Sequence, residues 1–238
     1  MKIIKDLKIK IFADGADKQS MLQMYQKDFI KGLTTNPTLM NKAGIKDYKG
    51  FCMDILGSIK NKPISFEVFS DDFEEMERQA LEIASWGENV YVKIPISNTA
   101  GESSSSLVAA LAKNNVKLNI TAIMTTEQVE EVVKVLNHNV ASFVSVFAGR
   151  IADTGVDPIP VMKETLNIMK SNAKSELIWA SPRELLNIFQ GDEIGCHVIT
   201  VTPDILKKLD LVAYNLNDYS LDTVKMFYND SLSAGYKL

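Results

Sequence analysis

Short apolar segments alternate with segments of helical periodicity along the chain, and this alternation constrains the fold more than any other feature. The apolar segments are rich in β-branched and aromatic residues, as β-strands are. Eight strands are predicted, at residues 8–14, 32–35, 63–69, 89–94, 116–121, 140–147, 175–180 and 195–201. Because parallel strands need crossover connections, strands that alternate with helices indicate a parallel sheet.

Eight strand–helix units favour an α/β fold of the closed (β/α)8 type, the TIM barrel. Such barrels commonly form one domain of about 200–250 residues, and this chain has 238 residues. The main alternative is a doubly wound open sheet, but no GxGxxG motif follows the first predicted strand. We therefore expect a single barrel domain over residues 1–238, with residues 219–238 as an extra amphipathic C-terminal helix.

Residues suited to cap a helix precede four of the helical segments. These candidate caps are Asp71 or Asp72, Thr125, Ser181 and Thr202. A proline follows Ser181 and Thr202 directly, as is typical of the first helical position. Helices are therefore predicted to begin just after each of these residues.

The composition argues against several classes of function. The net charge is −4 and no basic run is present, so we expect no nucleic-acid partner. No apolar run approaches the ~18 residues of a membrane span, and two cysteines without a CxxC motif fit a reducing cytoplasm. With only two histidines, a histidine-based metal site is not expected.

The segment NVYVKIPIS, residues 89–97, is a predicted strand with a lysine, Lys93, in its middle. Lysine is rarely buried without a partner. Burial disfavours the charged form of a lysine, and a neutral amine is a nucleophile that forms a Schiff base with a ketone or aldehyde. The alternative is a lysine on an edge strand whose ammonium group reaches the solvent.

Polar residues gather at the ends of the predicted strands, where the catalytic groups of a (β/α)8 barrel lie. They are Asp14, Thr34, Thr35, Asn36, Glu67, Lys93, Asn119, Thr121, Ser145, Arg150 and Ser181, whereas the eighth strand offers only Thr200 and Thr202. Asp14 and Glu67 are the candidate acid–base groups. The alternatives are a turn or helix cap for Asp14, a solvent-facing position for Glu67 and a surface ion pair for Arg150.

Six motifs in order resemble the transaldolase family over roughly residues 8 to 210. They are FAD (12–14), GLTTNPTLM (32–40), SFEV (65–68), VYVKIP (90–95), LNIT (118–121) and SVFAGRI (145–151). The chain is similar to the small bacterial and archaeal transaldolases and to the related fructose-6-phosphate aldolases. The resemblance implies sugar phosphates as substrates, no cofactor, and a homo-oligomer that is a pentamer or decamer.

The resemblance also implies a role for each site residue. Lys93 would form the Schiff base, Asp14 would move the proton of the donor's C4 hydroxyl, and Glu67 with Thr121 would hold a catalytic water. The substrate-binding residues would be Thr34, Asn36, Asn119, Ser145, Phe147, Arg150, Ser181 and Arg183.

Two positions bear on the type of reaction. The aldolase branch tends to have Gln at the position of Glu67 and Tyr at that of Phe147, so the resemblance favours transfer of a dihydroxyacetone unit. The donor would be a ketose phosphate such as fructose 6-phosphate or sedoheptulose 7-phosphate, and the acceptor an aldose phosphate. The alternatives are an aldolase that releases free dihydroxyacetone and a non-catalytic sugar-phosphate-binding barrel.

The segment WASPREL, residues 179–185, departs from the family pattern. In the family, a basic residue that helps to bind phosphate stands soon after the serine. Here the segment is shorter, and Pro182 follows Ser181 directly. Arg183 either supplies this charge or corresponds to a later arginine of the family.

Overall fold

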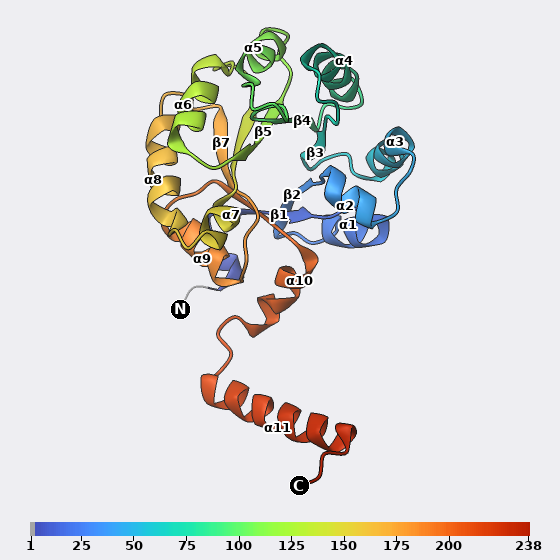
Figure 1. Ribbon diagram of the computed structural model, residues 1–238, viewed down its shortest axis with the longest axis vertical. Helices are drawn as coiled ribbons and strands as arrows, with labels where there is room; N and C mark the ends of the chain where they lie inside the picture. The colour runs from blue at the N-terminus through green and yellow to red at the C-terminus, as the bar shows by residue number, and fades with distance from the viewer. Residues whose placement is uncertain (1–2) are drawn as a thin grey trace.

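A closed barrel of eight parallel strands forms the centre of the computed structural model, which describes residues 3–238 (Figure 1). The strands follow one another in sequence order around the barrel, and the last pairs with the first. They are β1 (Lys10–Asp14), β2 (Ile30–Thr34), β3 (Ile64–Glu67), β4 (Val90–Pro95), β5 (Leu118–Ile123), β6 (Ser142–Val146), β7 (Ser175–Trp179) and β8 (Val198–Val201). The predicted (β/α)8 fold is confirmed, and the open-sheet alternative is wrong.

The predicted strands overlap the eight observed strands, and their ends differ by at most three residues. The largest difference is at β8, because the residues before Val198 still belong to the turn that ends the preceding helix, where Cys196 N donates to Gly191 O. β5 continues two residues beyond its predicted end through a bulge, at which Ala122 has a φ of +63°. Bulges re-aim side chains beside functional sites.

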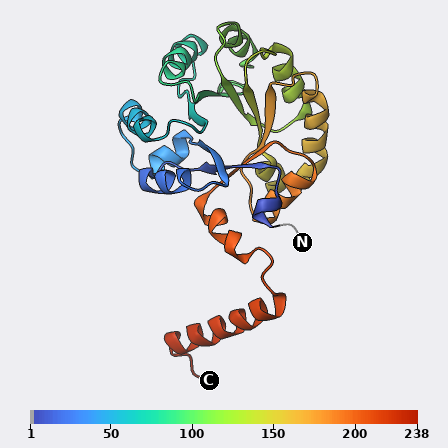
Figure 2. The ribbon, with the colours of Figure 1, turned by 180° about the vertical axis from the view of Figure 1, so that it is seen from behind.

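Helices surround the barrel and connect its strands, as Figure 1 and the reverse view in Figure 2 show. They are α1 (Lys18–Tyr25), α2 (Pro37–Lys42), α3 (Tyr48–Ser58), α4 (Phe73–Ala84), α5 (Ser105–Lys113), α6 (Thr126–Val135), α7 (Ala148–Asp153), α8 (Pro158–Met169), α9 (Leu186–Glu193), α10 (Pro203–Leu206) and α11 (Leu216–Ala234). Two 3₁₀ helices, η1 (Ile4–Asp6) and η2 (Lys207–Leu211), lie near the ends of the barrel sequence. None of the helices within residues 3–238 is long and apolar enough to cross a bilayer.

Three of the four predicted helix starts are confirmed. Asp72 accepts a hydrogen bond from Glu75 N, Thr125 forms a capping box with Gln128, and Thr202 precedes α10. Asp71, the other candidate at the first start, instead accepts hydrogen bonds from Thr99.

The prediction that Ser181 caps a helix is wrong, because α9 begins only at Leu186. Ser181 adopts a left-handed conformation with a φ of +58°. Its carbonyl oxygen lies so close to Gly149 that a Cβ there would be 1.5 Å away. The chain therefore crosses the barrel end before it turns into α9, and Asn187 Oδ1 accepts hydrogen bonds from the backbone on the way.

The inside of the barrel is packed rather than open. Phe12, Phe143, Ile178, Ala180 and Val198 form a cluster of their own, separate from the larger core between strands and helices. The rings of Phe12 and Phe143 meet edge to face with centroids 5.5 Å apart. This packing closes the interior beneath the carboxyl ends of the strands, as in other barrels of this type.

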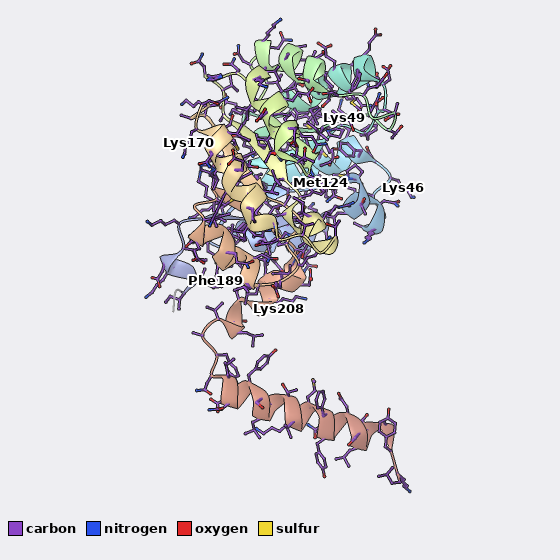
Figure 3. The ribbon with its side chains drawn as sticks, turned by 60° about the vertical axis from the view of Figure 1, so that its left-hand side comes forward. Lys46, Lys49, Met124, Lys170, Phe189 and Lys208 are labelled. Carbon is purple, nitrogen blue, oxygen red and sulfur yellow. The ribbon has the colours of Figure 1, made fainter. Side chains whose placement is uncertain are left out.

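α11 differs from the other helices because it lies away from the barrel (Figures 1 and 2). The predicted C-terminal helix is confirmed, but it begins three residues earlier, after the cap residue Asn215, and ends before Gly235 in a left-handed conformation. None of residues 216–234 is buried. Figure 3 shows side chains that project from all sides of this helix.

Candidate functional site

The carboxyl ends of the strands surround a cavity of about 660 Å³. All twelve predicted site residues line it: Asp14, Thr34, Asn36, Glu67, Lys93, Asn119, Thr121, Ser145, Phe147, Arg150, Ser181 and Arg183. A second cavity of about 700 Å³ is lined by the ends of α8 and α9 and the starts of β7 and β8, and contains none of these residues. The cavity at the carboxyl ends is therefore the candidate site, because the chemically active side chains converge there.

Lys93 lies on β4 with only 7% of its surface exposed. Its Nζ is 3.0 Å from Glu67 Oε2 and donates a hydrogen bond to Thr35 O at 3.0 Å. The pairing of Glu67 with Lys93 in the β3–β4 register places the carboxylate beside the ammonium group. The edge-strand alternative is wrong, because a closed barrel has no edge strand, and Glu67 faces the cavity rather than the solvent.

Asp14 ends β1 and faces the same cavity. Its Oδ1 accepts a hydrogen bond from Thr34 Oγ1 at 2.7 Å, and Thr34 Oγ1 lies 2.5 Å from Thr200 Oγ1. Enclosure by protein raises the pKa of Asp14, while the charge of Lys93 and the bond from Thr34 act in the opposite direction. The helix-cap alternative for Asp14 is wrong, because Asp17 caps α1.

A buried polar network lies beside Lys93. Asn119 is fully buried, donates from Nδ2 to Ser65 Oγ at 3.0 Å and accepts at Oδ1 from Ser145 Oγ at 2.7 Å. Thr121 is 2% exposed, and its hydroxyl has no hydrogen-bond partner within the described residues. Buried hydroxyls are usually paired, so the Thr121 hydroxyl is available to a molecule in the cavity.

Basic side chains stand at the rim of the cavity. The Arg150 guanidinium carbon lies 5.5 Å from the centre of the Phe147 ring. Arg183 Nε donates to Asp153 Oδ1 at 2.8 Å, and its Nη2 contacts Asp153 Oδ2. Asp204 adds a negative charge to this rim, and a hydrogen bond from the Thr202 hydroxyl lowers its pKa.

The remaining predicted residues also have defined places. Asn36 Oδ1 accepts from Leu39 N and so caps α2 at the edge of the cavity. Ser181 also lines the cavity, and its carbonyl oxygen lies close to Gly149 near the start of α7. Within residues 3–238, no group of three or more His, Cys, Asp or Glu side chains could hold a metal ion.

Ser65 and Thr200 belong to the hydrogen-bond network of the site, although the sequence analysis assigns a role to neither of them. Ser65 lies two positions before Glu67, so both side chains face the same side of β3, and this period of two was a usable signal. Thr200 lies two positions after Val198, which packs inside the barrel, and it faces the interior for the same reason. Nothing in the sequence around Thr200 indicates its contact with Thr34.

Comparisons with known proteins show the family to which the chain belongs. A family described as Transaldolase/Fructose-6-phosphate aldolase matches residues 11–233. The chain is 31% identical to a "Probable transaldolase" from Thermoanaerobacter sp., over 97% of this chain and 100% of that protein. It is 32% identical to a "Probable transaldolase" from Dehalococcoides mccartyi, over 84% of this chain and 90% of that protein.

A solved structure shares the fold alone. The crystal structure of dihydrodipicolinate synthase from Rhodopseudomonas palustris is 12% identical, with a TM-score of 0.59, over 98% of this chain and 82% of that one.

Proposed function

The chain belongs to the transaldolase/fructose-6-phosphate aldolase family, and from this premise we propose that it is a Schiff-base transaldolase. It transfers a dihydroxyacetone unit from a ketose phosphate, such as fructose 6-phosphate or sedoheptulose 7-phosphate, to an aldose phosphate. The observation that carries the proposal is a buried lysine, Lys93, whose Nζ lies 3.0 Å from a carboxylate in a cavity that Asp14 also lines.

Lys93 begins the reaction as the nucleophile. Its amine must lose a proton before it attacks the C2 carbonyl of the ketose, and Glu67 Oε2 at 3.0 Å is placed to accept that proton. The carbinolamine that forms loses water to give an iminium ion joined to Lys93. The positive nitrogen then draws electrons away from the neighbouring carbon–carbon bond.

Asp14 moves the proton that cleavage requires. Its carboxylate takes the proton of the C4 hydroxyl, the C3–C4 bond breaks, and the bonding electrons form an enamine with the iminium group. The shortened aldose leaves, and a new aldose aldehyde takes its place. The enamine carbon attacks that aldehyde, Asp14 returns the proton to the new hydroxyl, and water releases the product from Lys93.

The water of the imine steps is assigned to Glu67 and Thr121. The Thr121 hydroxyl is buried without a partner among the described residues, and the Glu67 carboxylate lines the same cavity. A water between them would satisfy the hydroxyl and lie near the Lys93 nitrogen. Formation of the imine releases a water at this place, and its hydrolysis consumes one.

Substrate binding is divided between the floor and the rim of the site. Asn119, held by Ser65 and Ser145, presents a fixed amide to the dihydroxyacetone unit, with Asn36 and Thr34 beside it. Phosphate binds at the rim to Arg150, Arg183 and Ser181, since arginine forks match phosphate oxygens. Arg183 keeps Nη1 for this purpose, because its Nε and Nη2 contact Asp153.

Transfer is favoured over simple aldol cleavage by Phe147. Release of free dihydroxyacetone requires a proton to reach the enamine carbon before an aldehyde does. Phe147 offers a ring without a hydroxyl at the cavity wall, and Arg150 stacks against that ring. The enamine is thus protected from a phenolic proton donor at this position until the acceptor arrives.

Reduction with borohydride tests the proposal. Incubation with fructose 6-phosphate and borohydride should add the mass of the reduced donor unit to Lys93, as located by peptide mass spectrometry. Lys93→Met should give no adduct while it retains the fold. An adduct at another residue, or none with any ketose phosphate, would contradict the proposal. Product analysis with and without an aldose phosphate then separates transfer from cleavage.

We also propose a homo-oligomer in which α11 is the contact between subunits. Apolar side chains of α11 that are at least half exposed include Leu221, Val224, Phe227, Tyr228 and Leu232. Such a concentration of apolar surface marks an interaction site.

A cytoplasmic location fits the two cysteines, Cys52 and Cys196, which are both buried and unpaired.

A further inference from the structure

Three side-chain oxygens from three neighbouring strands lie in a row inside the barrel. Asp14 Oδ1 on β1 is 2.7 Å from Thr34 Oγ1 on β2, which is 2.5 Å from Thr200 Oγ1 on β8. Thr34 is 3% exposed and Thr200 is 8% exposed. Because bulk water has little access to the two hydroxyls, each depends on the other and on Asp14 for its hydrogen bonds.

The number of available protons determines which group donates in each hydrogen bond of this row. An ionised carboxylate can only accept hydrogen bonds, and each threonine hydroxyl has one proton to donate. Thr34 therefore donates its proton to Asp14 Oδ1 whenever Asp14 is ionised. Thr34 has no second proton, so Thr200 must be the donor in the bond between the two threonines.

The same count of protons gives the two carboxylate oxygens of Asp14 different hydrogen-bond partners. Oδ1 is occupied by the proton of Thr34. Among the described residues, Thr34 supplies the one hydrogen bond to this carboxyl group. Oδ2 is thus the oxygen that is left to face a hydroxyl in the cavity.

We propose that Thr200 is a positioning residue of the reaction, whose hydroxyl acts through Thr34 to hold Asp14 Oδ1 as an acceptor while Oδ2 exchanges the proton. This inference rests on the proposed function, because it concerns the proton that Asp14 moves during cleavage. Oδ2 takes the proton of the C4 hydroxyl as the C3–C4 electrons pass to the iminium group, and it returns the proton in the addition step. Both threonines keep their own protons throughout.

The surroundings of Asp14 determine which measurement reveals this role. The charged groups that face it are Lys93 from β4 and Glu67 from β3, and the rim of the cavity adds Arg150, Arg183 and Asp204. Of the two strands that adjoin β1, β2 supplies the Thr34 hydroxyl that contacts Asp14, and β8 supplies the Thr200 hydroxyl that contacts Thr34. Enclosure raises the pKa of Asp14 and the Thr34 bond opposes it, so a weaker Thr34 donor should raise that pKa further.

The test compares variants that differ in one hydroxyl group. Thr200→Val removes the hydroxyl and keeps the shape of the side chain, whereas Thr200→Ser keeps the hydroxyl. Thr165→Val is the matched control, because Thr165 is a fully buried threonine on α8 that lies outside the cavity. For each full-length variant, kcat and KM are measured across pH with fructose 6-phosphate and an aldose phosphate acceptor.

Thr200→Val should lower kcat roughly three- to tenfold, the loss expected for one buried hydrogen bond, with KM little changed. The acid limb of the kcat profile should move up by about 0.3 to 0.5 pH unit. Thr200→Ser should restore both, and Thr165→Val should match the wild type. In a Thr34→Val background, Thr200→Val should add no further loss, because Thr200 acts only through Thr34.

The inference is overturned if Thr200→Val leaves the acid limb in place, or if its effect adds fully to that of Thr34→Val. Should Thr200→Val not fold, Thr200→Ala is measured against Thr200→Ser in the same way. Borohydride trapping on Lys93 separates the two levels of failure. An adduct with an unmoved acid limb rejects only the part assigned to Thr200, whereas no adduct with any ketose phosphate rejects the proposed function as well.

Discussion

The barrel and α11 both contain many apolar side chains, but these side chains lie in opposite environments. The strands β6 and β8 are buried along their whole length, whereas residues 216–234 of α11 include no buried side chain. Both regions have well-defined ends, since Asn215 caps α11 just as Asp72 caps α4. A capped helix can therefore form without burying any of its side chains, and the contacts around a helix decide what it contributes to stability.

The two regions also differ in the exposure of their ion pairs. In the barrel, the charges of Lys93 and Glu67 are enclosed and lie against each other. On α11, the ion pair of Lys225 with Asp222 is exposed, with 3.7 Å between the charged atoms. Exposed pairs of this kind contribute little to stability. The chemistry is thus concentrated in the barrel, and α11 offers an apolar surface.

The largest expected effect comes from the lysine of the barrel. Lys93→Arg keeps the positive charge but replaces the nucleophilic amine with a guanidinium group that stays protonated. We expect kcat to fall by a factor on the order of 10⁵, as when other enzymes lose their nucleophile, and no borohydride adduct to form. Lys225→Arg on α11 is the matched control and should retain full turnover. Substantial activity of Lys93→Arg would show that the barrel chemistry does not depend on this amine.

The next effect concerns stability. Ile94 on β4 is fully buried, so Ile94→Ala should lower the free energy of unfolding by about 2–5 kcal/mol, through lost burial and the cavity left behind. Leu221→Ala on α11 removes a side chain that is 51% exposed and should change the unfolding of the barrel by less than about 0.5 kcal/mol. Denaturant unfolding followed by tryptophan fluorescence measures both. Equal losses would mean that α11 is part of the same cooperative unit as the barrel.

A smaller effect follows from the enclosed carboxyl group of Asp14. Its pKa in the folded protein is raised above the ordinary value of 3.8, so the folded state holds this proton more tightly than the unfolded chain does. Stability is therefore lost as pH rises from about 4 through the folded pKa, and the loss is complete above it. Asp14→Asn should therefore raise the free energy of unfolding at pH 7.

Urea unfolding at several pH values tests this prediction, with Asp230→Asn on the exposed α11 as the control. The gain from Asp14→Asn should shrink as pH falls toward 4, because the wild-type carboxyl group in the folded protein then takes up its proton. A gain that is the same at pH 4 and pH 7 would point to packing rather than to ionisation.

The smallest effect on the barrel is expected from substitutions on α11. The double variant Leu221→Ser and Val224→Ser removes apolar surface from one stripe of α11, where both side chains are at least half exposed. The equilibrium constant for unfolding of the barrel and the turnover at saturating substrate should each stay within about twofold of the wild type. Light scattering should report a smaller particle. An unchanged particle mass would contradict the assignment of α11 as the subunit contact.

The sequence predicts the fold better than it predicts the contacts of the site. The strands and Lys93 can be found because a period of two, β-branched residues and a lysine in an apolar run are local signals. The ion pair between Lys93 and Glu67 depends on the register of β3 and β4, which local patterns do not determine. The pairing of Arg183 with Asp153 has no local signal either, because 30 positions separate the two residues.

Ser181 shows a different reason for failure. Serine followed by proline is a common start of a helix, but here the approach of Ser181 to Gly149 requires a left-handed turn. The competing requirement comes from Gly149 in α7, more than 30 positions away in the sequence, so the local pattern does not contain it. The role of Thr200 cannot be predicted from the sequence for a related reason. A single threonine in a strand is common, and the partner of Thr200, Thr34, lies on another strand.

Closure of the barrel between β8 and β1 also has a consequence for the order of folding. Phe12 is paired with Thr200, so the seam joins the strand of the barrel that is synthesised first to the strand that is synthesised last. Contacts of such long sequence separation form slowly and late. The row of oxygens from Asp14 to Thr200 crosses this seam, so a nascent chain can complete the candidate site only after β8 has been synthesised. Until then, β1 exposes an unpaired edge that can pair with other chains.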